Sequence, residues 1–573
     1  MSVKEPLDIL QKYWGYSSFR PNQERIISSI LSGKDTLGIM PTGGGKSIAY
    51  QVPALAKSGV CLVIEPLISL IKDQIDNLKK VGINAVTVNH LQTQEENFPA
   101  INQCLNYRSK FLFVSAEKVA GADFRRALVN IKINLIVIDE AHCISQWGHS
   151  FRPSYGRLGE LRDVFPDVPV LALTASATDN VKKDIVKVLR FSTVHPNILT
   201  SSFFRSNIHL KFTETSDKVE KIAITADYLG GSGIVYCSRR IDTILIAKEL
   251  KERFNIDAKP YHAHLSAYER SDTQNSWLRN ETRIIVATTA FGMGIDKPDV
   301  RFVIHSDIPS SIERYYQEFG RAGRDGLQAY SLVLYNRKDL IIQQTITENA
   351  YPEKKVVSNI YTMICNKERI ATGAGQGTYI PLDFNDLVIK SGQSNTAVYN
   401  SLKILENEGW ISLENNQKVS SRIKILVENS ELNTFLRQYE QYYYIMHYVL
   451  RLYPTIHHDF VDINEKLLAD NGMVSEKQVV KDLTMLMKYN IIRYEHRDKG
   501  DGIILLRDRA YSDRDLFTHE YYTLPKQTTI ERGKKMRELL LLKDCRWQYI
   551  LSYFGEQGQD CHICDNCKKS SSK

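Results

Sequence analysis

Short apolar runs alternate with longer, helix-compatible stretches between residues 35 and about 335, and this alternation restricts the possible folds more than any other feature of the chain. The runs are CLVIEP, KFLFVS, LIVIDE, VLALTA, GIVYCS, RIIVAT, RFVIHS and SLVLYN. Such alternation is typical of parallel sheets covered by helices. The runs divide near residues 201–225, so the pattern predicts two α/β domains with a nucleotide cleft between them.

The segment MPTGGGKS, residues 40–47, is the first candidate ligand-binding loop. It ends as the phosphate-loop template G-x-x-x-x-G-K-[ST] ends, although Met40 stands where the first glycine belongs. An apolar run precedes it and helix-compatible spacing follows, which is the context that the template requires. The glycines let backbone N–H groups converge on an anion, while Lys46 would reach the outer phosphates and Ser47 would hold Mg²⁺. The candidate nucleotide-binding residues are Thr42, Gly43, Gly44, Gly45, Lys46 and Ser47. A flexible turn without a ligand is the alternative.

Two further motifs carry charges suited to phosphoryl transfer. Asp139 and Glu140 follow the apolar run LIVID, and the carboxyl ends of parallel strands are where ligands bind in such sheets. Asp139 would hold Mg²⁺ and Glu140 would orient or deprotonate the attacking water, unless both acids are merely solvated.

In QEFGRAGRDG, Arg321 and Arg324 are three residues apart, and an arginine facing the cleft would stabilise transition-state charge. An exposed arginine pair without a role is the alternative.

The composition is that of a globular protein, with 43% hydrophobic and 24% charged residues. No apolar run approaches the roughly 18 residues needed to cross a bilayer, and the first residues lack the plan of a signal peptide. We therefore expect a cytoplasmic protein without a membrane partner, associated with the nucleoid if the source is bacterial. The formal charge of +8, from 74 basic and 66 acidic residues, permits nucleic acid as a partner without requiring it.

Four of the nine cysteines cluster near the C-terminus, at Cys545, Cys561, Cys564 and Cys567. Two C-x-x-C spacings that share Cys564, with a fourth cysteine upstream, predict a structural Zn²⁺ site with all four positions filled. We expect the other five cysteines to be ordinary buried thiols.

Between residues 343 and 530 the pattern becomes mainly helical. Residues 385–415 read as helix, turn, helix and strand, the outline of a winged helix. Residues 475–506 have a second outline of helix, strand, charged turn and strand, and the turn carries His496, Arg497 and Lys499. DNA contact and a small helical core without a DNA role are equally open for this second unit. The tyrosine-rich segment 438–453 favours packing over base stacking.

Seven motifs together resemble the ordered series of RecQ-type DNA helicases within helicase superfamily 2. They are GYSSFRPNQ, MPTGGGKS, EPLISLIKDQ, DEAHCISQWGHSFRPSY, LTASAT, ATTAFGMGIDKP and QEFGRAGRDG, and they cover about residues 7–340. The resemblance implies two RecA-like motor domains that use ATP to move 3′ to 5′ along single-stranded DNA and to separate duplexes. The family has methionine at the position of Met40.

The resemblance also implies roles for individual residues. Gln23 and Arg20 would recognise adenine, Tyr16 or Phe19 would stack on it, and Gln317 and Asp296 would complete the second wall of the site. Arg324 is the expected arginine finger, with Arg321 beside it on phosphate. The segment 143–155 resembles the loop that couples DNA occupancy to hydrolysis, and its candidate DNA-binding residues are Trp147, His149, Phe151, Arg152 and Tyr155. Without this context, the aromatic residues favour a place in the core.

CRWQYILSYFGE and the three cysteines after it resemble the zinc module of RecQ proteins. In the usual family order that module follows the second motor domain directly, whereas here residues 343–530 intervene. The expected domains are motor domains at 1–205 and 206–342, a winged-helix-like domain at 343–430, a second helical or winged unit at 431–530 and a zinc module at 531–573.

These features favour a monomeric ATP-dependent 3′ to 5′ DNA helicase of RecQ type, with ATP, Mg²⁺ and Zn²⁺ as cofactors, acting in recombination and repair. Its expected partner is single-stranded and 3′-tailed or branched duplex DNA. A DNA-stimulated translocase or annealing factor with weak unwinding is the second hypothesis, and a DNA-binding scaffold without hydrolysis is the third. RNA is an alternative substrate, because the motor motifs contact mainly backbone.

Overall fold

The computed structural model describes residues 5–89, 92, 94–145, 152–191, 196–292, 295, 297–414, 421–453, 456–457, 460–495 and 502–571. It divides into two compact units. Unit 1 contains Met1–Glu348 and Pro525–Lys573, and unit 2 contains Asn349–Leu524. Within the described residues, no helix is both long and apolar enough to span a bilayer.

The first sheet of unit 1 has the strand order β3-β4-β2-β5-β6-β1-β7, and every pairing is parallel. Its strands are β1 (Thr36–Ile39), β2 (Val60–Glu65), β3 (Ala85–Val88), β4 (Phe111–Ser115), β5 (Ile133–Ile138), β6 (Val170–Thr174) and β7 (Ile198–Thr200). The helices are α1 (Pro6–Trp14), α2 (Gln23–Leu31), α3 (Lys46–Ala56), α4 (Ile68–Lys80), α5 (Gln94–Leu105), α6 (Ala116–Val119), α7 (Ala122–Leu128) and α8 (Asp179–Val188), with short 3₁₀ segments η1 (Ala141–Ile144) and η2 (Pro153–Asp163).

This sheet is buried on both faces, which explains its continuous apolar strands. In β5, Ile136 and Ile138 belong to one hydrophobic core, while Leu135 and Val137 belong to another. Successive residues of a strand point to opposite faces, so a strand with helices on both sides needs apolar residues throughout. The parallel arrangement also brings the polar residues after β1, β2 and β5 to one edge of the sheet.

A second parallel sheet follows in the order β10-β11-β9-β12-β13-β8. Its strands are β8 (Ile208–Glu214), β9 (Ser232–Tyr236), β10 (Ala258–Tyr261), β11 (Ile284–Ala287), β12 (Val300–His305) and β13 (Ala329–Tyr335), and its helices are α9 (Lys218–Leu229), α10 (Arg240–Phe254), α11 (Ala267–Leu278), α12 (Ile312–Phe319) and α13 (Arg337–Asn349). The two predicted α/β domains are therefore present, and both have the RecA-like parallel-sheet architecture.

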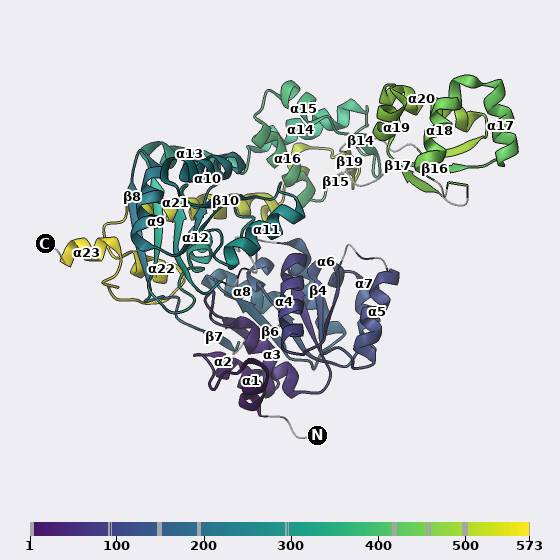
Figure 1. Cartoon of the computed structure of the whole chain (residues 1–573). Helices are drawn as coiled ribbons and strands as arrows, with labels where there is room; N and C mark the ends of the chain where they lie inside the picture. The colour runs from purple at the N-terminus through teal and green to yellow at the C-terminus, as the bar shows by residue number, and fades with distance from the viewer. Residues whose placement is uncertain are drawn as a thin grey trace. The chain divides into compact units, whose positions relative to one another are not determined.

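Unit 1 is completed by a segment that returns from the end of the chain. Residues 525–571, hereafter the cysteine module, contain most of α21 (Leu524–Leu541) together with α22 (Arg546–Tyr553) and α23 (Asp565–Ser571), drawn in yellow beside the second sheet in Figure 1. Trp547 is fully buried in the same core as the second sheet, and its indole N–H donates to the carbonyl of Ile208 at 3.1 Å. The Phe212 N–H donates to the Asp565 carboxylate at 3.0 Å. The module thus packs directly on β8 although residues 349–524 intervene in the chain.

Unit 2 contains two small sheets, β14-β19-β15 and β17-β16-β18. The strands are β14 (Tyr379–Pro381), β15 (Ile411–Glu414), β16 (Ser421–Ile425), β17 (Val461–Ile463), β18 (Ile492–Glu495) and β19 (Gly502–Leu505). The helices are α14 (Lys354–Lys367), α15 (Phe384–Ser391), α16 (Asn395–Asn407), α17 (Asn429–Gln438), α18 (Tyr443–Leu452), α19 (Glu465–Gly472) and α20 (Glu476–Lys488), with short 3₁₀ segments η4 (Glu440–Tyr442) and η5 (Asp513–Leu516) and a π-helical segment η6 (His519–Thr523).

The first winged-helix outline is present as α15, α16 and β15, but the second differs from the expectation. The strands on either side of the charged turn do not pair with each other, because β18 pairs with β16 while β19 pairs with β15. Residues 421–495 are therefore inserted into the β15–β19 hairpin of the first winged helix, and we call this segment the nested unit. The linear order expected from the sequence, with a boundary at residue 430, does not describe this arrangement.

The tyrosine-rich segment lies in the nested unit and mostly packs there, as its composition favours. Tyr442 is buried in the core of that unit, and four neighbours pack against the same core: Tyr439, Tyr444, Tyr448 and Tyr453. Tyr443 is 61% exposed, so a single tyrosine of the segment presents its ring to solvent.

Candidate nucleotide and zinc sites

The phosphate loop lies between β1 and α3, and α3 begins at Lys46. Gly43 and Gly45 have φ values of +78° and +79°, a region that favours glycine. A Cβ on Gly45 would lie 2.3 Å from Nε2 of Gln23, so this position also lacks space for a side chain. The loop and the N-terminus of α3 therefore present backbone N–H groups in the manner of an anion-binding site.

Residues predicted to recognise the base gather at this loop. The Gln23 side-chain amide donates to the carbonyls of Gly45 at 3.0 Å and Gly44 at 3.4 Å, and its Oε1 accepts from the Arg20 N–H at 2.8 Å. The Arg20 guanidinium donates to the Gly43 carbonyl. Tyr16 is 56% exposed, whereas Phe19 packs partly against the helices of the first domain. Tyr16 is thus the more accessible of the two candidates for stacking.

Both predicted carboxylates face the predicted lysine. Lys46 Nζ lies 3.2 Å from Glu140 Oε1 and 3.8 Å from Asp139 Oδ1. The Ser47 hydroxyl accepts from Gln74 Nε2 at 3.3 Å. Glu140 has a φ of +48°, and such backbone strain in a non-glycine residue clusters at functional sites. The structure therefore brings together Lys46 and Ser47 of the phosphate loop with Asp139 and Glu140 of the DEAH motif.

Burial and neighbouring charges set the ionisation of this group. Burial alone would raise the pKa of Glu140, but Lys46 and His142 hold it well below its usual range. Burial also raises the pKa of Asp139, and Lys46 only partly offsets this effect. For Lys46, burial is outweighed by Glu140 and Asp139, so its pKa is raised. Glu140 is thus ionised and able to accept a hydrogen bond from water, which suits a group that orients the attacking water.

Three polar residues of this site had no predicted role. His142 Nδ1 lies 3.2 Å from Glu140 Oε2 and 3.0 Å from the Thr174 hydroxyl. Across the two domains, Gln317 Nε2 donates to the Ser176 hydroxyl at 3.2 Å. His142, Thr174 and Ser176 all lie within the motifs DEAH and LTASAT, so their position was visible in the sequence even though their partners were not.

The arginine-bearing loop after α12 contacts the phosphate loop. The Thr42 hydroxyl donates to the Gly320 carbonyl at 2.9 Å. Arg324 lies against Gly43, since a Cβ on that glycine would be 3.1 Å from Arg324 Cγ. Arg321 is buried and donates to the Gly292 carbonyl. Of the two arginines, Arg324 is thus the one seated on the phosphate loop, while Asp296 lies outside the described residues.

The structure describes two of the five predicted DNA-binding residues, Arg152 and Tyr155. Trp147, His149 and Phe151 lie outside the described residues, as do His496, Arg497 and Lys499. Arg152 is partly exposed and donates to Glu117 at 3.4 Å. The expectation for Tyr155 is wrong, because its ring is 0% exposed and cannot stack on a base. The Tyr155 hydroxyl instead donates to the Asp139 carbonyl at 3.4 Å and so supports the carboxylate motif.

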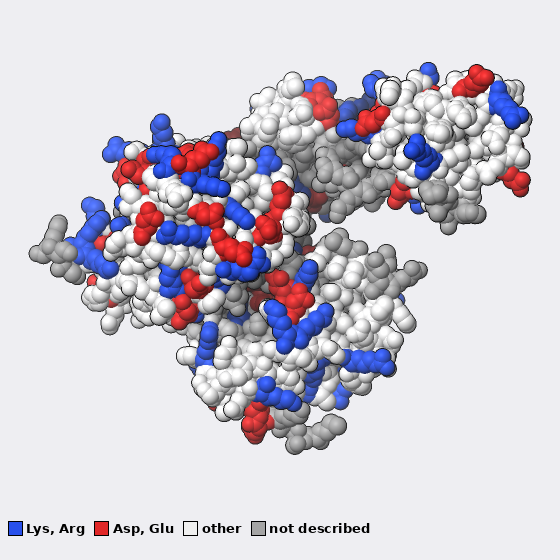
Figure 2. Space-filling model, in the orientation of Figure 1, with Lys and Arg blue, Asp and Glu red and all other residues white. Residues whose placement is uncertain are grey.

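Charges on the visible face of the second motor domain do not form a basic stripe. Figure 2 shows Lys and Arg side chains interleaved with Asp and Glu over this domain. Several charged residues of the second motor domain form exposed ion pairs, among them Arg253–Glu249 at 2.8 Å and Arg279–Glu281 at 2.7 Å. The excess positive charge of the chain therefore does not by itself mark a nucleic-acid path on this face.

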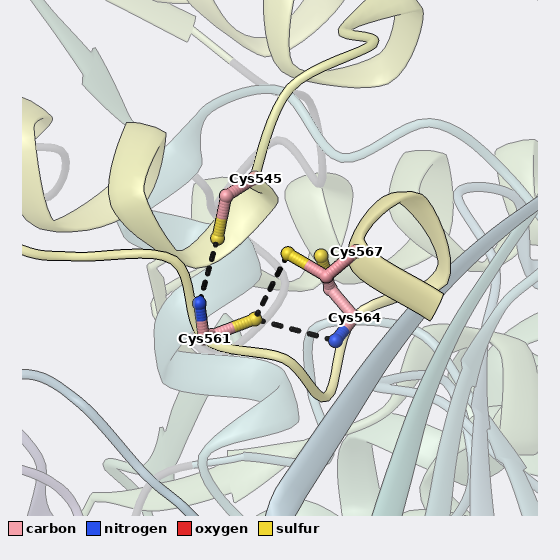
Figure 3. A group of neighbouring side chains, drawn as sticks. All are labelled: Cys545, Cys561, Cys564 and Cys567. Carbon is pink, nitrogen blue, oxygen red and sulfur yellow. Dashed lines mark hydrogen bonds between the residues drawn. The ribbon is translucent and has the colours of Figure 1, made fainter. Parts of the chain in front are cut away.

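The four clustered cysteines form one group (Figure 3), and their ligand atoms all lie within 4.8 Å of one another. Cys561 Sγ is 3.9 Å from Cys567 Sγ, which matches the separation of about 3.8 Å expected for two thiolates at about 2.3 Å from a tetrahedral Zn²⁺. Backbone N–H groups donate to the sulfurs of Cys545 and Cys561, as is usual around metal-bound thiolates. The cluster thus fits a structural Zn²⁺ site, and the other five cysteines are buried as expected.

Comparison with known proteins gives the class and then the family. Models match in chain order for DEAD/DEAH box helicase at residues 20–184, helicase conserved C-terminal domain at 217–326, RecQ helicase winged-helix domain (Bacteroidota) at 423–496 and RecQ zinc-binding at 514–568. With both motor models matched, the chain belongs by fold and sequence to helicase superfamily 2. Within that class the chain belongs to the RecQ family.

Individual relatives agree with this assignment. The ATP-dependent DNA helicase RecQ of Pasteurella multocida (strain Pm70) is 45% identical over 334 residues, which cover 58% of this chain and 52% of that protein. The probable ATP-dependent DNA helicase RecS of Bacillus subtilis (strain 168) is 40% identical over 343 residues, covering 59% of this chain and 68% of that protein. The chain thus spans about half the length of several curated relatives it matches.

A solved structure shows the same fold at low identity. The DUF1998 helicase MrfA, determined bound to DNA, superposes with a TM-score of 0.50 at 17% identity, covering 60% of this chain and 53% of that one. The RecQ zinc-binding match includes Cys545, Cys561, Cys564 and Cys567, so the cysteine cluster is the zinc site of this family.

Proposed function

We propose that the protein is an ATP-dependent 3′ to 5′ DNA helicase that opens duplex DNA in recombination and repair. The observation that carries this proposal is the contact between the two motor domains at the phosphate loop, where Thr42 bonds to Gly320 and Arg324 packs on Gly43. An arginine presented from a second domain completes a phosphoryl-transfer site only when the domains are close. Monomeric action and a cytoplasmic or nucleoid location belong to the same proposal.

Each residue has a task in hydrolysis. The phosphate-loop N–H groups and Lys46 bind the phosphates, and Gln23, Arg20 and Tyr16 recognise the base. Ser47 and Asp139 would hold Mg²⁺, which would supply positive charge to offset the charge of the phosphates. The ionised Glu140 accepts a proton from, or orients, the attacking water, and Arg324 stabilises the charge that develops on the transferred group. Asp296 and Gln317 would form the second wall of the site.

The experiment compares a 3′-tailed DNA duplex, a 5′-tailed DNA duplex and a 3′-tailed RNA duplex, each with MgATP. We expect opening of the 3′-tailed DNA alone, and its loss in Lys46→Ala and in Glu140→Gln. The wild type tests the scaffold hypothesis, because a scaffold would bind DNA without hydrolysing ATP. Opening of the RNA duplex at the same rate would contradict the proposed substrate.

A second candidate is a DNA-stimulated translocase that separates strands weakly. One observation favours it: β18 and β19 belong to different sheets, so the charged turn between them is not the tip of a hairpin formed by those two strands. DNA-stimulated hydrolysis without opening of any of the three duplexes would support this candidate.

A further inference from the structure

The connector between the two motor domains runs from the end of β7 to the start of β8 and is held by the cysteine module. Ser202 Oγ donates to Glu556 Oε1 at 2.5 Å, and the Phe203 N–H donates to Glu556 Oε2 at 2.8 Å. The Phe203 ring stacks on Phe554 with centroids 4.5 Å apart and an interplanar angle of 14°. Both carboxylate oxygens of Glu556 are thus used on two consecutive residues of the connector.

The same connector is also fixed by the motor domains. The Phe203 carbonyl accepts from the Tyr316 hydroxyl of α12 at 3.0 Å, and Phe203 is buried. On the other side, the Asn22 side chain donates to the Thr200 carbonyl at 3.2 Å and to the Ser201 hydroxyl at 3.0 Å. Asn22 immediately precedes Gln23, which contacts the phosphate loop. The connector therefore has little freedom to move without disturbing groups of the nucleotide site.

Two residues after Phe203, Arg205 bridges both halves of that site. One guanidinium nitrogen donates to the Thr42 carbonyl at 3.2 Å and to the Gly320 carbonyl at 3.4 Å. The other donates to the carbonyls of Ala322 at 3.2 Å and Gly323 at 2.9 Å. Arg205 thus connects the phosphate loop to the loop that carries Arg321 and Arg324.

The module reaches the first motor domain as well. A Cβ on Gly555, which has a φ of +80°, would lie 3.2 Å from the carboxylate of Asp179 at the start of α8. The turn that carries Phe554, Gly555 and Glu556 therefore lies against the first domain and the connector, while Trp547 of the same module is anchored on β8. The cysteine module thus contacts the first motor domain, the connector and the second motor domain.

We propose that Glu556 is a positioning residue for ATP hydrolysis, acting through the connector and Arg205. By holding the Ser202 hydroxyl and the Phe203 N–H, Glu556 sets the place of Arg205, and Arg205 sets the spacing between the phosphate loop and the Arg324 loop. Within the part of the chain that the structure describes, the hydrogen bonds of the Glu556 carboxylate go to Ser202 and Phe203 and not to a residue of the nucleotide site. The inference rests on the proposed ATP hydrolysis, and it gives the cysteine module a role in the motor cycle besides its own structure.

The test uses the full-length, zinc-loaded protein and three variants: Glu556→Ala, Glu556→Gln and Gln557→Ala. The glutamine can still accept the Phe203 N–H, and Gln557 is an exposed neighbour in the same turn. With saturating single-stranded DNA, we expect Glu556→Ala to lower kcat about 3- to 10-fold while KM for ATP stays within about twofold, because misplacement of a distant group costs rate more than ground-state binding. Glu556→Gln should recover most of the rate, and Gln557→Ala should match the wild type.

Zinc content and Tm separate positioning from simple destabilisation. An unchanged kcat in Glu556→Ala would overturn the inference, and so would a joint loss of kcat, zinc and Tm. If the wild type shows no DNA-stimulated hydrolysis, the proposed function is wrong. The connector role of Glu556 is then tested by hydrogen exchange in the absence of nucleotide. Amides of peptides covering 201–207 and 319–326 should exchange faster in Glu556→Ala than in Gln557→Ala, and equal exchange would contradict the connector role.

Discussion

At the scale of single residues, Gly45 combines two reasons for the absence of a side chain. Its φ of +79° disfavours other residues, and a Cβ would collide with the Gln23 amide. We predict that Gly45→Ala lowers stability by about 1 kcal/mol through backbone strain and also raises KM for ATP at least about tenfold, because Gln23 is displaced. Steady-state hydrolysis and thermal unfolding measure the two effects.

Gly33 is the matched control for this substitution. Its φ is +81°, and a Cβ there would meet nothing within 4 Å. Gly33→Ala should therefore cost a similar free energy of unfolding without changing KM for ATP. An equal rise of KM in both variants would show that strain alone, and not the Gln23 contact, explains the effect.

His142 makes the stability of unit 1 depend on pH. Burial by itself would lower the pKa of His142, but Cys143 and Glu140 raise it to about 10. The unfolded value is about 6.5, so the stabilisation is complete below about pH 6.5 and is lost as pH rises towards 10. We predict that Tm falls between pH 7 and 9.5 in the wild type, and that His142→Gln reduces this slope.

The exposed His264 provides the comparison for that measurement. His264→Gln should leave the dependence of Tm on pH as it is in the wild type. If both histidine variants have the same slope as the wild type, the ion pair between His142 and Glu140 does not contribute to stability in this range.

The sequence predicts the position of residues whose surroundings are defined by their neighbours in the chain. It does not predict contacts between segments that are distant in the chain. Lys46 and Glu140 were predictable, because a glycine loop before a helix and acids after a buried strand define their own surroundings. Arg205 and Glu556 carried no local pattern, since their partners lie in other domains. Tyr155 was misplaced because only the packed core determines whether an aromatic ring remains exposed.

At the scale of elements, unit 2 shows how one strand can belong to an unexpected sheet. In the outline predicted for residues 475–506, a charged turn lay between two strands, and these strands correspond to β18 and β19. Periodicity cannot identify the partner of a strand, however, and here the first winged helix supplies the partner of β19. Among the described residues, the cores of the first winged helix and of the nested unit share no member.

Separate cores predict that the nested unit can be removed. Glu414 and Gly502 are cross-strand partners in the antiparallel β15–β19 pair, so replacing residues 415–501 by Asn-Gly should close a two-residue hairpin. We expect the remaining chain to keep its cooperative unfolding and to hydrolyse ATP within about twofold of the wild-type rate. Limited proteolysis should show a stable first winged helix. Removing Glu414 as well shifts the register by one residue, and this control should lose that stability.

At the scale of the whole molecule, unit 1 is built from two parts of the chain that are separated in sequence by unit 2. The cysteine module follows unit 2 in sequence, yet it packs on β8 and contacts the connector. The C-terminal end of α13 lies beside α21, since a Cβ on Gly533 would be 2.7 Å from Thr347, and Arg537 donates to Gln343 at 2.6 Å. Unit 2 is thus an insertion between two neighbouring helices of unit 1, which explains how a displaced module keeps its docking site.

This arrangement predicts that unit 1 folds and hydrolyses ATP without unit 2. Replacing residues 350–523 by a flexible linker of about six residues would join α13 to α21, whose contacts through Thr347 and Gln343 remain. We expect the variant to bind zinc, to unfold cooperatively and to show DNA-stimulated hydrolysis within about threefold of the wild type, because every group of the nucleotide site lies in unit 1. Opening of a 3′-tailed duplex should fall at least about tenfold, since strand separation needs a surface that holds the duplex ahead of the motor.

The same deletion with Lys46→Ala controls for contaminating hydrolysis. Unchanged opening would place the separating surface in unit 1, whereas loss of zinc and of folding would show that unit 2 supports the docking of the cysteine module.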